Sequence, residues 1–452
     1  MRIAYLGAGA AGRYCGACLH DNTLATALRT LGEDIVLIPT YTPLRTDEEN
    51  ISHSRVFFGG VNVYLQQKTA LFRHTPWFID AMFDSPRLLA WLSKKSSGMQ
   101  ARELGALAIS TFQGEHGRQR KEIEKLVHWL AGDFRPDVVH LSNAMLAGVA
   151  RTIRQRLGVP IVCGLAGEDI FLEALEEPHY SEARRLMKEK ARDIDAFVAL
   201  NHYYADYMAD YLEVPRTSIE VIRHGLNLAG HGTRPQRAGR AEATTTVGYF
   251  ARVAPEKGLH LLVEAYALVC QDTTLPRTRL RVAGYKSAGD EPYFQTIVRR
   301  IDELGLNDRF EYAGELDRQS KIEFLQSLDL MAVPTIYRES KGISVLEALA
   351  NAVPVVLPAH GTFPEYLADT AGGLLCEPDS PHSLAGKLAE LIRDAESADE
   401  LGLIGQAAIR ARYTSEAMAA GHREMYARIL GKPNGTPASW GVTQHSRGVP
   451  SV

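Results

Sequence analysis

Two glutamates, Glu339 and Glu347, frame the stretch ESKGISVLE, with seven residues between them. The apolar run 330–334 precedes them and predicts a strand, and a helix is expected from Ile343. Both carboxylates and the amides at the helix start would then line one pocket at the strand end. Such a pocket suits an anionic or hydroxyl-rich ligand, for example a sugar. Taken alone, a pair of this kind is more often a helix cap or solvated charge.

Two cations, Arg252 and Lys257, follow the predicted strand TTVGYF (245–250) in an R-x4-K arrangement ahead of a helix. Two cations at a strand end suit a diphosphate, because Arg can fork two oxygens and Lys acts as a point charge. They could stabilise a departing nucleoside diphosphate without a metal. A solvated basic loop is the alternative when the motif is considered alone.

The glycines at 7–12 fit the G-x-G-x-x-G fingerprint of dinucleotide-binding sites. That site needs a helix directly after the glycines and an acidic residue at the end of the second strand. Here the helix is expected only from about Asp21, and no acid follows the strand at 35–38 until Asp47. The fingerprint therefore fails in its context.

Cys15 and Cys18 fit C-x-x-C, a pattern typical of redox and zinc sites. The other three cysteines are isolated in the sequence, and a zinc site would have to borrow His20 and Asp21. We therefore interpret this motif as a coincidence of two small residues in a tight loop.

Apolar runs alternate with helical patterns along the chain, which predicts an α/β fold with parallel sheets. One series falls within residues 1–229 and another within 246–414, so two doubly wound Rossmann-like domains are expected to face each other across a cleft. The polar stretch 230–245 is interpreted as a linker. A final helix is expected at 415–430 and a disordered tail at 431–452.

The segment 68–130 is predicted to be helical and is rich in Trp, Phe and Met. We expect its apolar residues to pack within the first domain. The alternatives are an acceptor groove or a surface that contacts a membrane peripherally.

The amino-acid composition argues against some classes of function. The chain has 452 residues, 45% of them hydrophobic and 23% charged, with a net charge of −4. This balance provides no basic field for nucleic acid or an anionic membrane. Five cysteines in so long a chain predict no disulfide framework and a reducing, cytoplasmic location. No apolar run approaches the length of a membrane span, and the opening residues are interpreted as a strand rather than a signal peptide.

The order and spacing of the motifs in the second half resemble those of family 4 glycosyltransferases of the GT-B fold. The resemblance covers roughly residues 1–430 and is looser before Val221. The segments that carry it are VIRHGLN (221–227), the Arg252 to Lys257 loop, RVAGY (281–285), LGLNDRFEYAGEL (304–316), LDLMAVPT (328–335), the Glu339 to Glu347 segment and GTFPEYL (361–367).

The resemblance implies a retaining glycosyltransferase that needs neither metal nor cofactor and uses a nucleoside diphosphate sugar, with UDP- or GDP-sugar expected, as donor. Arg252, Lys257 and Glu339 would be the catalytic residues: the two cations hold the diphosphate, and Glu339 contacts the donor sugar. Glu347 would bind the ribose. The other donor contacts implied are Gly16, Thr335, Gly342, Ile343 and Ser344.

The acceptor side departs from the family pattern. Lys341 stands where an apolar aromatic residue is usual, and its side chain either binds a charged ligand or points to solvent. His140 is kept at a strand end, but Ser142 and Ala166 replace histidines, while Asp169 matches. We expect His140, Asp169 and Lys341 on the acceptor side, with no evident first-domain base.

The acceptor itself stays unidentified as a small molecule, a saccharide or a lipid-linked sugar. A catalytically inert nucleotide-sugar-binding protein is one alternative. A sugar phosphorylase or an NAD-linked oxidoreductase on a similar double-Rossmann frame is the other.

Overall fold

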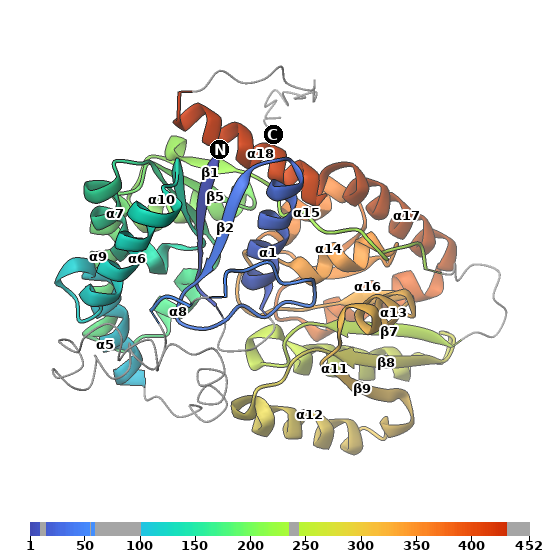
Figure 1. Cartoon of the computed structure of the whole chain (residues 1–452). Helices are drawn as coiled ribbons and strands as arrows, with labels where there is room; N and C mark the ends of the chain where they lie inside the picture. Colours follow the sequence, from blue (N-terminus) through green and yellow to red (C-terminus); the bar gives the residue numbers. More distant parts are fainter. Residues whose placement is uncertain (10–14, 55, 59–100, 235–243, 432–452) are drawn as a thin grey trace, which may run out of the picture.

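The chain folds into two α/β domains, each built on a six-stranded parallel sheet with helices on its faces (Figure 1). The fold class predicted from the sequence, two doubly wound Rossmann-like domains, is confirmed. The computed structural model describes residues 1–9, 15–54, 56–58, 101–234 and 244–431. Residues 432–452 of the predicted tail, residues 68–100 of the segment predicted to be helical and residues 235–243 of the predicted linker lie outside these residues.

The sheet of the first domain has the strand order β2-β1-β3-β4-β5-β6. Every residue of β1 after Arg2 is buried, because the strand lies inside the sheet and helices cover both faces. In the register of the sheet, Tyr5 of β1 lies opposite Leu37 on one side and His140 on the other. The strands are β1 (Arg2–Gly7), β2 (Asp34–Pro39), β3 (Val138–Leu141), β4 (Ile161–Leu165), β5 (Ala196–Ala199) and β6 (Ile219–Val221).

Helix α1 (Gly16–Thr30) begins five residues before the position expected from the sequence, so the prediction of a late helix start at Asp21 is wrong. The extended backbone of Cys15, with φ −141° and ψ 133°, caps the helix, and its carbonyl accepts from the Leu19 amide at 3.0 Å. The other helices of this domain are α5 (Ala101–Phe112), α6 (Arg120–Trp129), α7 (Ala150–Leu157), α8 (Glu168–Glu173), α9 (His179–Ala191) and α10 (His202–Leu212).

The sheet of the second domain has the order β12-β11-β10-β7-β8-β9. Its strands are β7 (Thr245–Phe250), β8 (Thr278–Ala283), β9 (Phe310–Gly314), β10 (Leu330–Ala332), β11 (Val355–Pro358) and β12 (Gly373–Cys376). Its helices are α11 (Leu259–Gln271), α12 (Glu291–Glu303), α13 (Arg318–Gln326), α14 (Ile343–Ala350), α15 (Phe363–Thr370), α16 (Pro381–Arg393) and α17 (Ala395–Arg412). Strands β7 and β10 are neighbours in this sheet, so the loops that follow them lie side by side.

The last helix, α18 (Ser415–Ile429), returns to the first domain and packs against α1 (Figure 1). Its side chains Met418, Met425 and Tyr426 belong to the core cluster that contains Ile3 and Tyr5 of β1. No helix among the described residues is long and apolar enough to cross a membrane.

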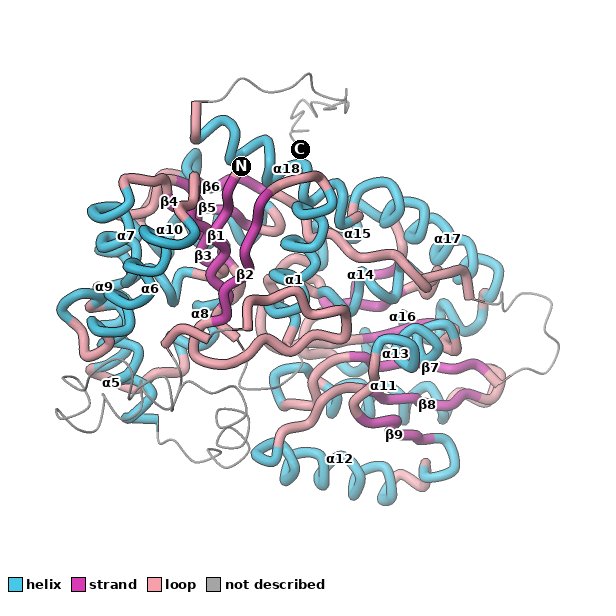
Figure 2. Tube along the Cα trace, in the orientation of Figure 1, coloured by secondary structure: helices cyan, strands magenta, loops and turns pink. Residues whose placement is uncertain are grey.

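The loops at the carboxyl ends of the two sheets contact each other, and Figure 2 shows α1 and the loops that follow β2 between the two sheets. The Lys341 ammonium donates to the carbonyl of Ala166 after β4 at 2.5 Å. The Asn201 amide after β5 donates to the carbonyl of Ser340 at 2.7 Å. Loops from three strand ends therefore form the interdomain region, where ligands of α/β folds bind.

Within the predicted linker 230–245, Arg234 is anchored in the second domain. Its guanidinium lies 2.6 Å from Asp399 and 3.7 Å from Asp329, and all three side chains are at most 6% exposed. Its Nε also donates to the carbonyl of Ala352 at 3.0 Å. This buried cluster fixes the chain where it enters the second domain.

The substitution Arg234→Ala is expected to lower the free energy of unfolding by roughly 3–5 kcal/mol, because it leaves buried carboxylates without their cation. Urea unfolding followed by circular dichroism measures the loss. Arg393→Ala is the matched control, since Arg393 is 56% exposed in its ion pair with Asp272. That control should change stability by no more than about 0.5 kcal/mol.

Candidate functional site

The structure brings together Glu339 and Lys257, which the sequence indicated from separate motifs. Lys257 ends the short turn η6 (Pro255–Lys257), and its ammonium lies 2.6 Å from Glu339 Oε2. The Tyr337 hydroxyl donates to the same oxygen at 2.6 Å, and it also contacts Lys257. The backbone amide of Lys341 donates to Oε1 at 3.2 Å. A buried carboxylate thus has donors on both oxygens.

These contacts decide the protonation of Glu339. Burial alone would raise the pKa of its carboxyl, but Lys257 and Tyr337 overcome that effect and hold the pKa at about 2. The side chain is therefore an anion at neutral pH. Its charge in turn helps burial raise the pKa of the Tyr337 phenol.

Glu347 lies in α14 and is held by a lysine that the sequence analysis missed. Lys321 of α13 places its ammonium 2.5 Å from Glu347 Oε1 and also pairs with Asp47 of the first domain. All three side chains are less than 10% exposed. Burial raises the pKa of Glu347, and Lys321 opposes that rise. The ion pairs of Lys321 therefore link the two domains.

A second basic residue of α13 makes a parallel link. Arg318 lies 3.2 Å from Glu48 and donates to the carbonyls of Asn227 and Ala229 at 2.8 and 2.9 Å. Arg318 and Lys321 stand three residues apart, which places them on one face of the helix. That spacing was the available sequence signal, but their acidic partners in the first domain, Glu48 and Asp47, lie some 270 residues away in the chain.

Arg252 is placed differently from Lys257. Its side chain is 45% exposed and pairs with Glu256, four residues later. It is close enough to Tyr337 for its charge to oppose the rise in that phenol's pKa. The two predicted cations therefore flank Tyr337, with Lys257 inside the site and Arg252 at its edge.

Several buried polar atoms near Glu339 have no hydrogen-bond partner among the described residues. They are Thr335 Oγ1, Ser340 Oγ, His360 Nδ1 and Thr362 Oγ1. The His360 ring bonds through Nε2 to the carbonyl of Thr335 at 2.9 Å, and the Thr362 amide donates to the carbonyl of Glu339 at 2.9 Å. Buried polar groups are nearly always bonded, so this gathering of unsatisfied atoms indicates a place for a polar ligand.

The start of α14 supplies the remaining predicted donor contacts. Gly342 has φ +56°, a left-handed conformation that suits glycine, and the helix begins at Ile343 with Ser344 next. Backbone amides at such a start have no helical partner and favour an anion. Gly16, at the start of α1, faces this turn: a Cβ added to it would lie 3.1 Å from Ile343 Cδ1.

The three residues predicted for the acceptor side are all engaged with protein groups. Lys341 is bonded to Ala166 across the domains, as described above. Asp169 accepts from the Tyr204 hydroxyl at 2.6 Å. His140 is 1% exposed and lies 2.5 Å from the Tyr426 hydroxyl of α18, and burial lowers its pKa well below the usual range.

A small interdomain cavity of about 20 Å³, room for roughly one water, lies beside these residues. Its walls include His140, Lys341 and the buried carboxyl of Asp21 on α1. Tyr5 donates to Asp21 at 2.8 Å, and burial raises the pKa of Asp21 to about 7. From the sequence, Asp21 was expected only as the helix start and as a zinc ligand in a rejected alternative, because a hydrophobic pattern does not mark a buried carboxyl.

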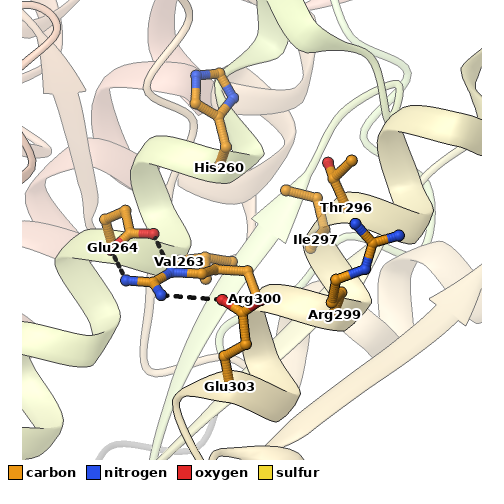
Figure 3. A pocket seen from close by; sticks show the side chains of 8 residues that line it. All are labelled: His260, Val263, Glu264, Thr296, Ile297, Arg299, Arg300 and Glu303. Atoms are coloured by element: carbon orange, nitrogen blue, oxygen red, sulfur yellow. Dashed lines mark hydrogen bonds and ion pairs between the residues drawn. The ribbon is translucent and has the colours of Figure 1, made fainter.

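A larger recess of about 280 Å³ opens between α11 and α12 (Figure 3). Arg300 crosses it to bond Glu264 at 2.6 and 3.0 Å and Glu303 at 3.1 Å. None of its lining residues is among the predicted site residues, and its Arg300 is already paired with Glu264 and Glu303. We therefore locate the functional site at the interdomain loops.

Comparison with known proteins assigns the class. Residues 22–225 match the family described as "Glycosyl transferase 4-like domain", and residues 233–407 match "Glycosyl transferases group 1". Together the two models cover most of both domains. The chain belongs to the family 4 glycosyltransferases of the GT-B fold, as its motifs predicted.

Two curated relatives are D-inositol 3-phosphate glycosyltransferases. The protein of Mycolicibacterium smegmatis is 28% identical over 265 residues, which cover 57% of this chain and 59% of that one. The protein of Corynebacterium glutamicum is 28% identical over 280 residues, which cover 59% and 66%. The chain thus matches less than two thirds of the length of either relative.

Solved structures share the fold. A sucrose-phosphate synthase from Thermosynechococcus elongatus superposes with a TM-score of 0.70 at 18% identity, over 95% of this chain and 99% of that one. Anabaena HepE in complex with UDP-glucose superposes with a TM-score of 0.63 at 18% identity, over 95% and 100%. These likenesses extend over both domains and confirm the GT-B architecture.

The pairing of Glu339 with Lys257 predicts a pH-dependent contribution to stability. A carboxyl whose pKa falls on folding from 4.5 to about 2 stabilises the native state above pH 4.5, and this contribution is lost as pH falls through 2. The difference in unfolding free energy between wild type and Glu339→Gln should therefore shrink by about 2 kcal/mol between pH 6 and pH 3. Urea titrations at each pH measure it. An unchanged difference would contradict the pairing, and Glu400→Gln, at an exposed position of α17, is the control.

Proposed function

We propose that this protein is a retaining glycosyltransferase that moves a sugar from a nucleoside diphosphate sugar to a hydroxyl acceptor. The observation that carries the proposal is the ionised Glu339 held by Lys257, beside unsatisfied polar atoms and the amide-rich start of α14. Family membership supports the reaction class. Anabaena HepE was crystallised in complex with UDP-glucose, which makes a UDP-sugar the first donor to test.

In the proposed complex, Arg252 and Lys257 bind the donor diphosphate. Lys257 is now neutralised by Glu339 and Arg252 by Glu256, so the diphosphate has to compete with two carboxylates. The arriving sugar hydroxyls would compensate Glu339 by donating to it. Glu347 would accept from the ribose hydroxyls, with its charge still balanced by Lys321.

Several neutral groups would complete the donor site. The hydroxyls of Thr335 and Ser344 and the amides near Gly342 and Ile343 are suited to the nucleotide and the phosphates. Gly16 would let the start of α1 approach the phosphates from the first domain, because any side chain at this position would press on Ile343.

Retention is proposed to follow from attack of the acceptor on the face that the diphosphate leaves. In that mechanism the departing phosphate oxygen accepts the proton of the acceptor hydroxyl, and the two cations stabilise its developing charge. A first-domain base is not needed, which fits the positions at which Ser142 and Ala166 stand. Metal independence is part of the same proposal.

The acceptor would bind on the first domain near Asp169 and the contact between Lys341 and Ala166. The curated relatives are named for D-inositol 3-phosphate, so this compound is the first acceptor to test. Breaking the bond from Lys341 to Ala166 would free an ammonium for a phosphorylated acceptor.

The proposal is tested by incubating UDP-, GDP- and ADP-sugars with inositol phosphates and other polyols, and following the product by NMR. An α-linked product from an α-linked donor supports retention, and inversion overturns it. Binding of UDP or GDP without turnover would favour the inert binding protein. A thermal shift with NAD and none with nucleoside diphosphates would overturn the transferase.

The substitution Arg252→Ala should weaken UDP binding by about ten- to a hundredfold, because a charged hydrogen bond is worth about 1.5–3 kcal/mol. Isothermal titration calorimetry measures the affinity. Arg300→Ala is the matched control, since Arg300 is similarly exposed and paired but lies in the recess of Figure 3. Equal effects of the two substitutions would contradict the role of Arg252.

The substitution Gly16→Val should reduce UDP-sugar turnover at least tenfold, because its side chain would press on Ile343 at the start of α14. Gly386→Val in α16 is the control, since a Cβ there meets nothing within 4 Å. Both substitutions place valine in a helix, so the difference in turnover between the two variants reports the effect of the contact with Ile343. A folded Gly16→Val variant with full turnover would contradict the proposed approach.

A further inference from the structure

Cys15 and Cys18 occupy the first turn of α1 as a pair of free thiols. Cys15 is the partly exposed residue that caps the helix, whereas Cys18 is 2% exposed and packs in the core with Tyr5. The two side chains hydrogen-bond to each other. The pair therefore combines a partly exposed cysteine at the N-cap with a buried partner one turn away.

The electrostatics of the two thiols differ. The hydrogen bond from Cys18, helped by the charge of Lys341 from the second domain, lowers the pKa of Cys15 to about 5 despite its burial. The same contact, together with burial, raises the pKa of Cys18. The lowered pKa favours the thiolate form of Cys15, and the raised pKa keeps Cys18 a neutral thiol.

A proton acceptor follows on the same face of the helix. Asp21 is three residues beyond Cys18, is 2% exposed, and has a pKa raised by burial to about 7. Its carboxylate raises the pKa of Cys18 through its charge, so the two groups are close. Asp21 is suited to receive a proton from the Cys18 thiol.

We propose that Cys15 and Cys18 form a reversible oxidation site that controls binding of the sugar donor. Hydrogen peroxide is the oxidant: Cys15 Sγ attacks one oxygen, the O–O bond breaks, and the departing hydroxide takes a proton from solvent and leaves as water. Asp21 then takes the Cys18 proton, Cys18 Sγ attacks the sulfur of the resulting sulfenic acid, the S–O bond breaks, and Asp21 passes the proton to the departing hydroxide, which leaves as a second water. The dithiol loses two electrons and the peroxide gains them.

The disulfide would act on the donor site through Gly16, so this inference rests on the proposed function. A disulfide holds the Cβ atoms of its two cysteines about 3.5–4.5 Å apart. Forming it ties the extended N-cap Cys15 to Cys18 and constrains the backbone at Gly16 between them, which faces Ile343 at the start of α14. It also removes the thiolate that faces Lys341. Oxidation should therefore weaken donor binding.

The remaining cysteines provide internal comparisons. Cys163 and Cys376 are buried, and burial raises the pKa of each thiol. Cys270 is partly exposed like Cys15, but its sulfur lies beside the Thr278 hydroxyl at 3.7 Å rather than another thiol. Cys270 therefore serves as the control for Cys15, because it is partly exposed in the same way but its sulfur lies beside a hydroxyl and not beside a second thiol.

The test oxidises the full-length reduced protein with hydrogen peroxide, maps thiols by alkylation and mass spectrometry, and measures UDP affinity by calorimetry. We expect loss of two thiols as a Cys15–Cys18 disulfide, UDP binding about tenfold weaker, equivalent to about 1.4 kcal/mol, and recovery with dithiothreitol. Cys18→Ala should bind UDP normally when reduced and should accumulate a sulfenic acid at Cys15. Cys270→Ser should behave as wild type.

Absence of the disulfide, or oxidation of Cys270 as fast as Cys15, would overturn the oxidation site. A disulfide with unchanged UDP affinity would overturn the control of donor binding. If the reduced protein binds no nucleoside diphosphate, the proposed donor binding fails, and so does the proposed control of donor binding by oxidation. The alkylation and mass-spectrometry result alone then decides whether the oxidation site exists.

Discussion

Charge compensation of two buried carboxylates is the constraint on which the interdomain region depends. Glu339 and Glu347 are each less than 10% exposed, and an unpaired anion in such a place would neutralise itself or destabilise the fold. Lys257 and Lys321 supply the compensation. Lys321 pairs with Asp47 of the first domain as well as with Glu347, so the cation that compensates a buried carboxylate of the second domain also joins the two domains. The same interaction therefore sets a side-chain charge and a domain arrangement.

The same charge compensation determines which chemical groups a ligand must carry in order to bind. A diphosphate that recruits Lys257 leaves Glu339 without its cation, unless donors of the ligand replace it. A sugar donor carries both parts on one molecule: phosphate oxygens for the cations and hydroxyls for the carboxylate. A bare phosphate carries only the first. On the proposed function, the paired site would favour a complete sugar donor over an isolated anion, because Lys257, Tyr337 and Glu339 already satisfy one another.

The sequence predicted the parts of this site that depend on local pattern. Long apolar runs marked the strands of both sheets, and strand ends located Lys257 and Glu339, which meet because β7 and β10 are neighbours. The partners Lys321 and Asp47 could not be predicted, since they are far apart in sequence and meet only when the domains pack. The start of α1 was misplaced because a glycine next to a cysteine carries little helical signal, although Cys15 caps the helix.

The first turn of α1 meets two requirements that conflict for most residues. It has to approach the start of α14 closely, which demands a glycine at position 16, and it has to fill the core beneath, which demands a small apolar side chain at position 18. Cysteine satisfies the second requirement as well as alanine does, and with Cys15 it adds a thiol pair to a turn that contacts the start of α14. A change in the backbone of this turn therefore reaches the start of α14 through the contact of Gly16 with Ile343, where an added Cβ would lie only 3.1 Å from the Ile343 side chain.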